Sequence, residues 1–277
     1  MTATLRAEGV SKSFGGLQAL SGCSLTAPAG RITGLIGPNG SGKTTLFNAI
    51  TGYERIDAGD VYLGDRRITG AAPQRVFAYG IGRTFQLTRI FPRLTVLENM
   101  LVPAQRGLSG RRHREHAMEL LSFTGIANHA EALAGTLSYG QRKLLELSYV
   151  LVADPAVILL DEPAGGVNPS LINTIADRIR ELNQAGKTFL LVEHNMDFVM
   201  SLCDEVTVLD SGTVVATGTP AAVRADPRVL DAYLGGAPDD AGPADAGRTD
   251  AAPVDGWPAG DAPGAAGHAA DGGASHG

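Results

Sequence analysis

Cysteine, tryptophan and long apolar runs are scarce in this sequence of 277 residues. The two cysteines, Cys23 and Cys203, are far apart and match no metal-binding spacing, so we expect two free thiols in a reduced cytosolic protein. No apolar run approaches the roughly 18 residues that span a bilayer. The first residues also lack the basic-then-apolar pattern of a secretory signal. Any role at a membrane would therefore depend on a partner.

An excess of basic residues is also lacking, which leaves room only for local basic patches, and the charge is unevenly distributed. Of the net charge of −6, all lies in residues 236–277, which hold seven Asp and one Arg. Residues 1–235 are formally neutral, so we expect no nucleic-acid partner. The tail is mostly Ala, Gly, Pro and Asp, which cannot bury enough apolar surface to offset the entropy of ordering. We expect a folded domain over 1–235 and a disordered tail over 236–277.

The most informative stretch runs from Gly37 to Thr45 and fits the phosphate-loop pattern G-x-x-x-x-G-K-[ST]. An apolar strand is predicted before it and a helix after it, which is the context this loop requires. Glycines let backbone N–H groups approach phosphate oxygens, and the N-terminus of the helix favours the same anion. We therefore expect a bound nucleoside triphosphate. The predicted phosphate-loop residues are Gly37, Pro38, Asn39, Gly40, Ser41, Gly42, Lys43, Thr44 and Thr45.

Two carboxylates follow a second predicted strand. The run 157–160 is continuously apolar, which is typical of a parallel strand buried on both faces. Asp161 and Glu162 come directly after it, at the strand end where α/β proteins bind ligands. A further buried strand over 188–192 leads to His194.

Two other features are weaker by themselves. Ser138 and Gln141 have capping-box spacing before a leucine-rich helix. Phe14 precedes a Gly-Gly turn and could stack on a nucleobase or belong to the core, and the residues alone leave both open.

Taken together, these motifs resemble the nucleotide-binding subunit of an ABC transporter over residues 5–235. The resemblance places the Walker A motif at 37–45 and the Walker B motif at 157–161. It implies an α/β fold of the P-loop NTPase type, with a mainly parallel core sheet, an N-terminal antiparallel β subdomain and an α-helical subdomain inserted at about 87–153. The signature residues that it implies are Leu137, Ser138, Tyr139, Gly140 and Gln141.

The resemblance also implies roles for individual residues, with ATP and Mg²⁺ as cofactors. Glu162 would polarise the attacking water, with Lys43 and His194 as the other catalytic residues. Phe14 would stack on adenine, and the signature would contact ATP bound to a second ATPase subunit. The implied metal ligands are Thr44, Gln86 and Asp161, and Gln86 would also contact ATP.

Within the family, several motifs resemble the ATPases of branched-chain (hydrophobic) amino acid uptake systems. That branch implies import through two membrane permease subunits, indirectly supplied by a solute-binding protein, at the cytoplasmic face of the inner membrane. An importer of urea, amides or aromatic acids, an exporter, and a non-transport ABC ATPase stay open. Tyr139 and Asn168 depart from the general family pattern but resemble this branch. The motifs of the branch are 83–86, 137–141, 162–169, 193–197 and 232–235.

The segment between Gln86 and Glu98 is unusually apolar for its length. We expect part of it to form a groove for a short permease helix, although packing in the core would explain the same residues. Its apolar residues are Leu87, Ile90, Phe91, Leu94, Val96 and Leu97.

Overall fold

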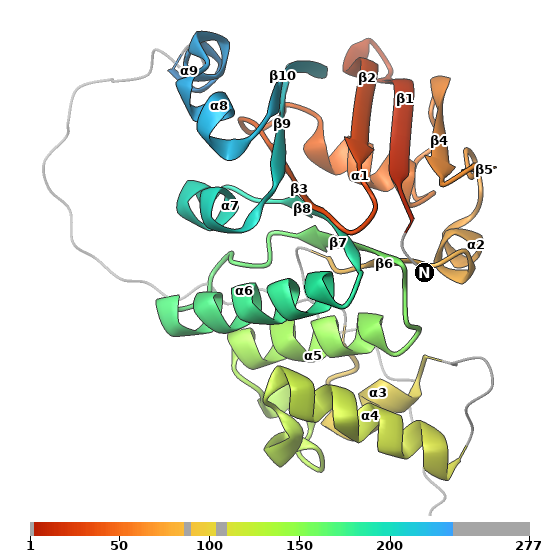
Figure 1. The fold of residues 1–277 in the computed structure, drawn as a ribbon. Coiled ribbons are helices and arrows are strands. Elements are labelled where there is room, and N and C mark those ends of the chain that lie inside the picture. Colours follow the sequence, from red (N-terminus) through yellow and green to blue (C-terminus); the bar gives the residue numbers. More distant parts are fainter. Residues whose placement is uncertain (1–2, 86–89, 104–109, 235–277) are drawn as a thin grey trace, which may run out of the picture. The chain divides into compact units, whose positions relative to one another are not determined.

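A computed structural model of the protein describes residues 3–85, 90–103 and 110–234. In these ranges the strands form two sheets (Figure 1). One is antiparallel and consists of β1 (Leu5–Phe14), β2 (Leu17–Ala27), β4 (Ala58–Leu63) and β5 (Arg66–Arg67), in the order β2-β1-β4-β5. The other consists of β3 (Ile32–Ile36), β6 (Ile81–Arg83), β7 (Val157–Asp161), β8 (Thr188–Val192), β9 (Glu205–Asp210) and β10 (Thr213–Gly218).

The second sheet has the order β10-β9-β3-β8-β7-β6, and all of its neighbouring strands are parallel except β9 and β10. Every residue of β3, β7 and β8 is buried, which is why these segments are mostly apolar in sequence. Alternate side chains point to opposite faces. Leu159 and Leu190 therefore join the apolar cluster that includes the antiparallel sheet, whereas Ile158 and Leu191 join a cluster with the helices of the other face.

Helix α1 (Lys43–Ile50) begins within the phosphate-loop motif, at Lys43, and packs its buried face, including Leu46 and Phe47, in the cluster of the antiparallel sheet. The C-terminal ends of the parallel strands lie along one edge of the sheet, where this loop is also located. The other helices of the sheet region are α2 (Pro73–Ala78), α6 (Pro169–Gln184), α7 (Met196–Leu202), α8 (Pro220–Ala225) and α9 (Pro227–Leu234).

All described elements between β6 and β7 are helical. They are α3 (Val96–Leu101), α4 (Arg111–Thr124), two 3₁₀ turns (Ala127–His129 and Ala134–Thr136) and α5 (Tyr139–Leu151). Helices α3, α4 and α5 pack against one another (Figure 1). The capping box predicted at Ser138 is present at the start of α5, and Thr95 forms a second one with Glu98 at the start of α3. None of the helices in the described ranges has the combination of length and hydropathy needed to cross a bilayer.

The predicted α/β fold class, with a mainly parallel core sheet and an antiparallel sheet, is confirmed. Residues 17–27 form one long strand, β2, that contains a local irregularity. The apolar pattern breaks at Gly22, whose φ of 62° accompanies irregular pairing with β1. The limits of the helical subdomain (87–153) stay a prediction. So does the division at 235, because residues 235–277 lie outside the described ranges.

Candidate functional site

The phosphate loop connects β3 to α1 and needs glycine at two positions. Gly37 and Gly42 have φ values of 150° and 103°. A Cβ atom would lie 1.9 Å from the Leu209 carbonyl oxygen at the first position and 2.6 Å from the Ala19 carbonyl oxygen at the second. Any side chain there would collide with the backbone that surrounds the loop. The close approach of the loop to its neighbours therefore explains these two glycines.

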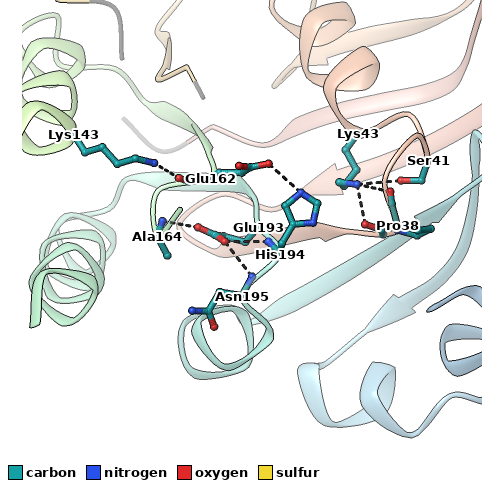
Figure 2. Close-up of polar contacts among 10 residues, drawn as sticks. Pro38, Ser41, Lys43, Lys143, Glu162, Ala164, Glu193, His194 and Asn195 are labelled. Atoms are coloured by element: carbon teal, nitrogen blue, oxygen red, sulfur yellow. Dashed lines mark hydrogen bonds and ion pairs between the residues drawn. The ribbon is translucent and has the colours of Figure 1, made fainter. Parts of the chain in front are cut away.

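Lys43 is the buried cation of this loop, with only 6% of its surface exposed. Its ammonium donates to the carbonyl oxygens of Gly37 (2.8 Å) and Pro38 (2.7 Å) and to the Ser41 hydroxyl (3.3 Å; Figure 2). Burial lowers the pKa of Lys43, and the negative charges of Glu162 and Asp161 partly oppose that shift. These carboxylates therefore help to keep the lysine charged, as binding of phosphate would require.

A cleft runs along the loop and brings together residues from distant parts of the chain. Phe14 lines it and is 45% exposed, so this aromatic ring does not belong to the core. The ammonium of Lys12 lies 4.9 Å from the centre of the ring. The predicted site residues that line the cleft are Phe14, Asn39, Gly40, Gly42, Lys43, Thr44, Thr45, Glu162 and His194.

Glu162 and His194 meet where two adjacent strands end. Glu162 follows β7, and His194 lies two residues beyond the end of β8. Oε1 of Glu162 is 3.0 Å from Nε2 of His194 (Figure 2). The Glu162 side chain is 22% exposed and that of His194 is 44% exposed. Glu162 has a φ of 50°, in the left-handed region that non-glycine residues rarely adopt. Such backbone strain is common where a side chain must be held in one orientation.

Asp161 lies deeper than Glu162 and forms a buried ion pair that the sequence analysis missed. Its Oδ2 is 3.0 Å from Nη2 of Arg83, and each side chain is 7% exposed. Arg83 also donates from Nη1 to Asn48 (2.7 Å) and to Thr51 (3.0 Å) on the segment that follows the phosphate loop. The guanidinium therefore connects β6, β7 and α1. The sequence signal for this ion pair was a charged residue, Arg83, at the end of a strand of the buried sheet.

The signature residues do not line the cleft. Ser138 caps α5, where its hydroxyl accepts from the Gln141 N–H (3.3 Å) and its own N–H donates to Gln141 Oε1 (2.9 Å). Tyr139 is 39% exposed and packs beside Gly166, at which a Cβ atom would lie 3.0 Å from the ring. Leu137 and Gly140 are buried. The phosphate loop and the signature of one chain are thus separate sites.

The predicted metal ligands are only partly described. Gln86 lies outside the described ranges. Thr44 offers a hydroxyl in the cleft, and Asp161 and Glu162 offer carboxylates nearby, which are the hard oxygen donors that Mg²⁺ prefers. No group of three or more His, Cys, Asp or Glu side chains in the described ranges would hold a metal alone. This donor set fits Mg²⁺ that takes its remaining ligands from phosphate and water.

Two further buried charges adjoin Glu162, and neither was among the predicted site residues. Lys143 is 8% exposed and donates to the Glu162 carbonyl oxygen, while Glu193 is 2% exposed. Burial lowers the pKa of Lys143 and raises that of Glu193. The sequence signals were a lysine close to the predicted signature for Lys143 and a carboxylate at the end of an apolar run for Glu193.

Comparison with known proteins identifies the family. A family model described as "ABC transporter" matches residues 20–165, and one described as "Branched-chain amino acid ATP-binding cassette transporter" matches residues 213–239. The chain belongs to the ABC transporter family. It is therefore an ATP-binding cassette, an ATPase coupled to transport that works with membrane permease subunits.

Relatives resemble this cassette over nearly their whole length. It is 38% identical over 250 residues to the high-affinity branched-chain amino acid transport ATP-binding protein LivG of Escherichia coli K12, covering 84% of this chain and 98% of that protein. For the probable LivG of Methanocaldococcus jannaschii the identity is 37% over 249 residues, covering 83% and 97%. The solved ADP conformation of the cassette MJ1267 is 36% identical, with a TM-score of 0.78 and coverage of 85% and 100%.

Proposed function

We propose that this cassette hydrolyses ATP at the cytoplasmic face of the inner membrane to power uptake of branched-chain or other hydrophobic amino acids. Two observations support this cargo. Relatives named LivG and BraF carry branched-chain amino acid transport in their names, and the C-terminal family model carries the same description. The observation that carries hydrolysis is the contact between Glu162 and His194 in the cleft that also holds the phosphate loop.

In this proposal the residues of the cleft divide the work of phosphoryl transfer, which depends on positioning and charge stabilisation. Lys43 would exchange its contacts with the loop carbonyls for phosphate oxygens. Mg²⁺, held by Thr44 and Asp161 together with Gln86, would neutralise phosphate charge. Glu162 would orient the attacking water and accept its proton, while His194 holds the carboxylate of Glu162 through the 3.0 Å contact.

A second ATPase subunit completes the site in this proposal. Ser138 stands at the N-terminus of α5 and would offer its hydroxyl and nearby N–H groups to phosphate. It does not line the cleft that contains Lys43 of the same chain. A signature supplied by an identical or related partner would close over the nucleotide.

A separate groove on the chain is the proposed docking site for a permease helix. It is lined mainly by aromatic and aliphatic side chains, and Tyr53, Phe77 and Phe91 are 49%, 38% and 47% exposed. Such a surface suits the apolar face of a short amphipathic helix. Phe91 therefore belongs to the groove, whereas Val96 and Leu97 are core residues and Leu87 lies outside the described ranges. Arg83 and Phe85 also line this groove, next to the nucleotide site.

The replacement Glu162→Gln tests the proposed hydrolysis. It should leave ATP binding unchanged and lower turnover by roughly 10²–10⁴, the usual contribution of a positioned base. Both quantities are measured with the cassette assembled with its permeases. Glu115→Gln, on the exposed side of α4, is the control and should change neither quantity. Undiminished turnover in Glu162→Gln would remove Glu162 from this role.

A further inference from the structure

Glu193 is a buried carboxylate that contacts two functional loops at once. It follows β8 directly and is 2% exposed. Its Oε1 accepts from the Ala164 N–H (2.5 Å), and its Oε2 accepts from the N–H groups of His194 (3.0 Å) and Asn195 (3.2 Å). Figure 2 shows these contacts beside the pair formed by Glu162 and His194. One side chain therefore joins the loop after β7 to the loop after β8.

These two loops carry the groups that must meet for hydrolysis. Strands β7 and β8 are paired up to their ends, where the Glu162 N–H donates to the Val192 carbonyl oxygen (2.9 Å). Beyond that bond the chain segments separate into their loops. Glu193 continues the connection between them, since it holds the backbone two residues after Glu162 and the backbone of His194 itself.

The backbone of Glu162 is in a conformation that its surroundings must maintain. Its φ of 50° is unfavourable for a residue with a side chain, so neighbouring contacts have to select it. The Gly165 N–H and the ammonium of Lys143 both donate to the Glu162 carbonyl oxygen. Glu193 holds Ala164, inside the same turn. The direction of the Glu162 side chain therefore depends on the backbone contacts made by Gly165, Lys143 and Glu193.

The cost of burying Glu193 indicates that its contacts matter. Burial raises the pKa of this carboxyl, whereas the three N–H donors and the positive charge of Lys143 oppose the shift. A glutamine at this position would keep one acceptor and present an N–H₂ group where Oε2 now accepts two bonds. The His194 and Asn195 N–H groups would then be left without this acceptor.

We propose that Glu193 is a positioning residue for ATP hydrolysis, which keeps Glu162 and His194 in register by tying their two loops together. The inference rests on the proposed function, because it assigns Glu193 an effect through Glu162. It also separates Glu193 from ATP binding, since Glu193 has no hydrogen bond to the phosphate loop in the described part of the chain.

The test compares Glu193→Gln with Thr188→Val in the full-length cassette assembled with its permeases. Thr188 lies at the opposite end of β8, is fully buried, and hydrogen-bonds to Ala3 (3.1 Å) and Gly30 (2.9 Å). Its replacement also leaves partly buried backbone groups without this partner, far from the cleft. Glu193→Gln should lower kcat at least about 10-fold with KM for ATP changed less than about 2-fold, since only positioning is lost. Thr188→Val should lower the melting temperature and leave kcat within about 2-fold.

The double variant of Glu162→Gln and Glu193→Gln completes the design. If Glu193 acts through Glu162, the double variant should turn over no more slowly than Glu162→Gln alone. Unchanged kcat in Glu193→Gln, or losses that multiply in the double variant, would overturn the inference while leaving the proposed function intact. Unchanged turnover in Glu162→Gln would overturn the proposed function instead. If Glu193→Gln does not fold, Glu193→Asp, which keeps the charge and shortens the side chain, should show the same selective loss of kcat.

Discussion

Replacing the buried Arg83 by methionine should lower the free energy of unfolding far more than the same replacement of an arginine on the surface. Methionine keeps an unbranched apolar side chain but removes the charge that pairs with Asp161. It also removes the donors to Asn48 and Thr51 and the contacts of the guanidinium with the rings of Phe47, Tyr53 and Phe85, whose centres lie 5.0–5.8 Å from it.

The exposure of the ion pair decides the expected magnitude. Both side chains are 7% exposed, so solvent screens their interaction little and Asp161 would be left as an uncompensated buried charge. Removing one partner of such a pair costs about 3–5 kcal/mol of the free energy of unfolding. Arg111, which pairs with Glu115 while 91% exposed, provides the matched control. For Arg111→Met the expected loss is about 0.5 kcal/mol or less.

Urea unfolding of the full-length chain, followed by circular dichroism, measures both variants. Adding Asp161→Asn to Arg83→Met should restore about 1–3 kcal/mol relative to the sum of the two single losses, because no lone charge then remains buried. An Arg83→Met variant as stable as Arg111→Met would refute this reasoning. So would strictly additive losses in the double variant.

Three further predictions concern docking, thiols and the tail. Phe91→Asp should abolish co-purification with the permeases and spare ATP binding. Leu230 is similarly exposed but lies outside the groove, so Leu230→Asp should spare both. A loss of folding in Phe91→Asp would favour a core role. Burial raises the pKa of Cys203 to about 12 and also raises that of Cys23. A thiol reagent near pH 8 should therefore label neither cysteine until the protein unfolds. Rapid labelling of the native protein would contradict the structure. Deleting residues 237–277 should leave the melting temperature and the ATPase activity unchanged, and a melting temperature lowered by several degrees would show that the tail packs.

Local sequence patterns predicted the elements that depend on neighbouring residues. The phosphate loop, the capping box at Ser138, and the apolar strands β7 and β8 each follow from spacing within about ten residues. Such patterns also placed Glu162 and His194 at strand ends. They could not order the strands, and the contact of these two side chains follows only from the adjacency of β7 and β8.

The contacts that the sequence analysis missed join residues distant in the chain. Arg83 and Asp161 are separated by 78 positions, and Ala164 and Glu193 by 29. No periodicity connects such pairs, because their contact depends on the packing of β6 beside β7 and of β7 beside β8. Local spacing also left Phe14 undecided between core and cleft, and the structure gives it an exposed ring in the cleft beside the phosphate loop.

Uptake of labelled leucine tests the central claim most directly. The cassette is reconstituted in vesicles with its permeases, a second ATPase subunit and the solute-binding protein, and Mg²⁺ and ATP are supplied on the side of the cassette. Leucine should accumulate with the wild-type chain, excess isoleucine or valine should compete and urea should not, and Glu162→Gln should abolish accumulation. ATP hydrolysis without leucine uptake, or equal uptake with Glu162→Gln, would contradict the account.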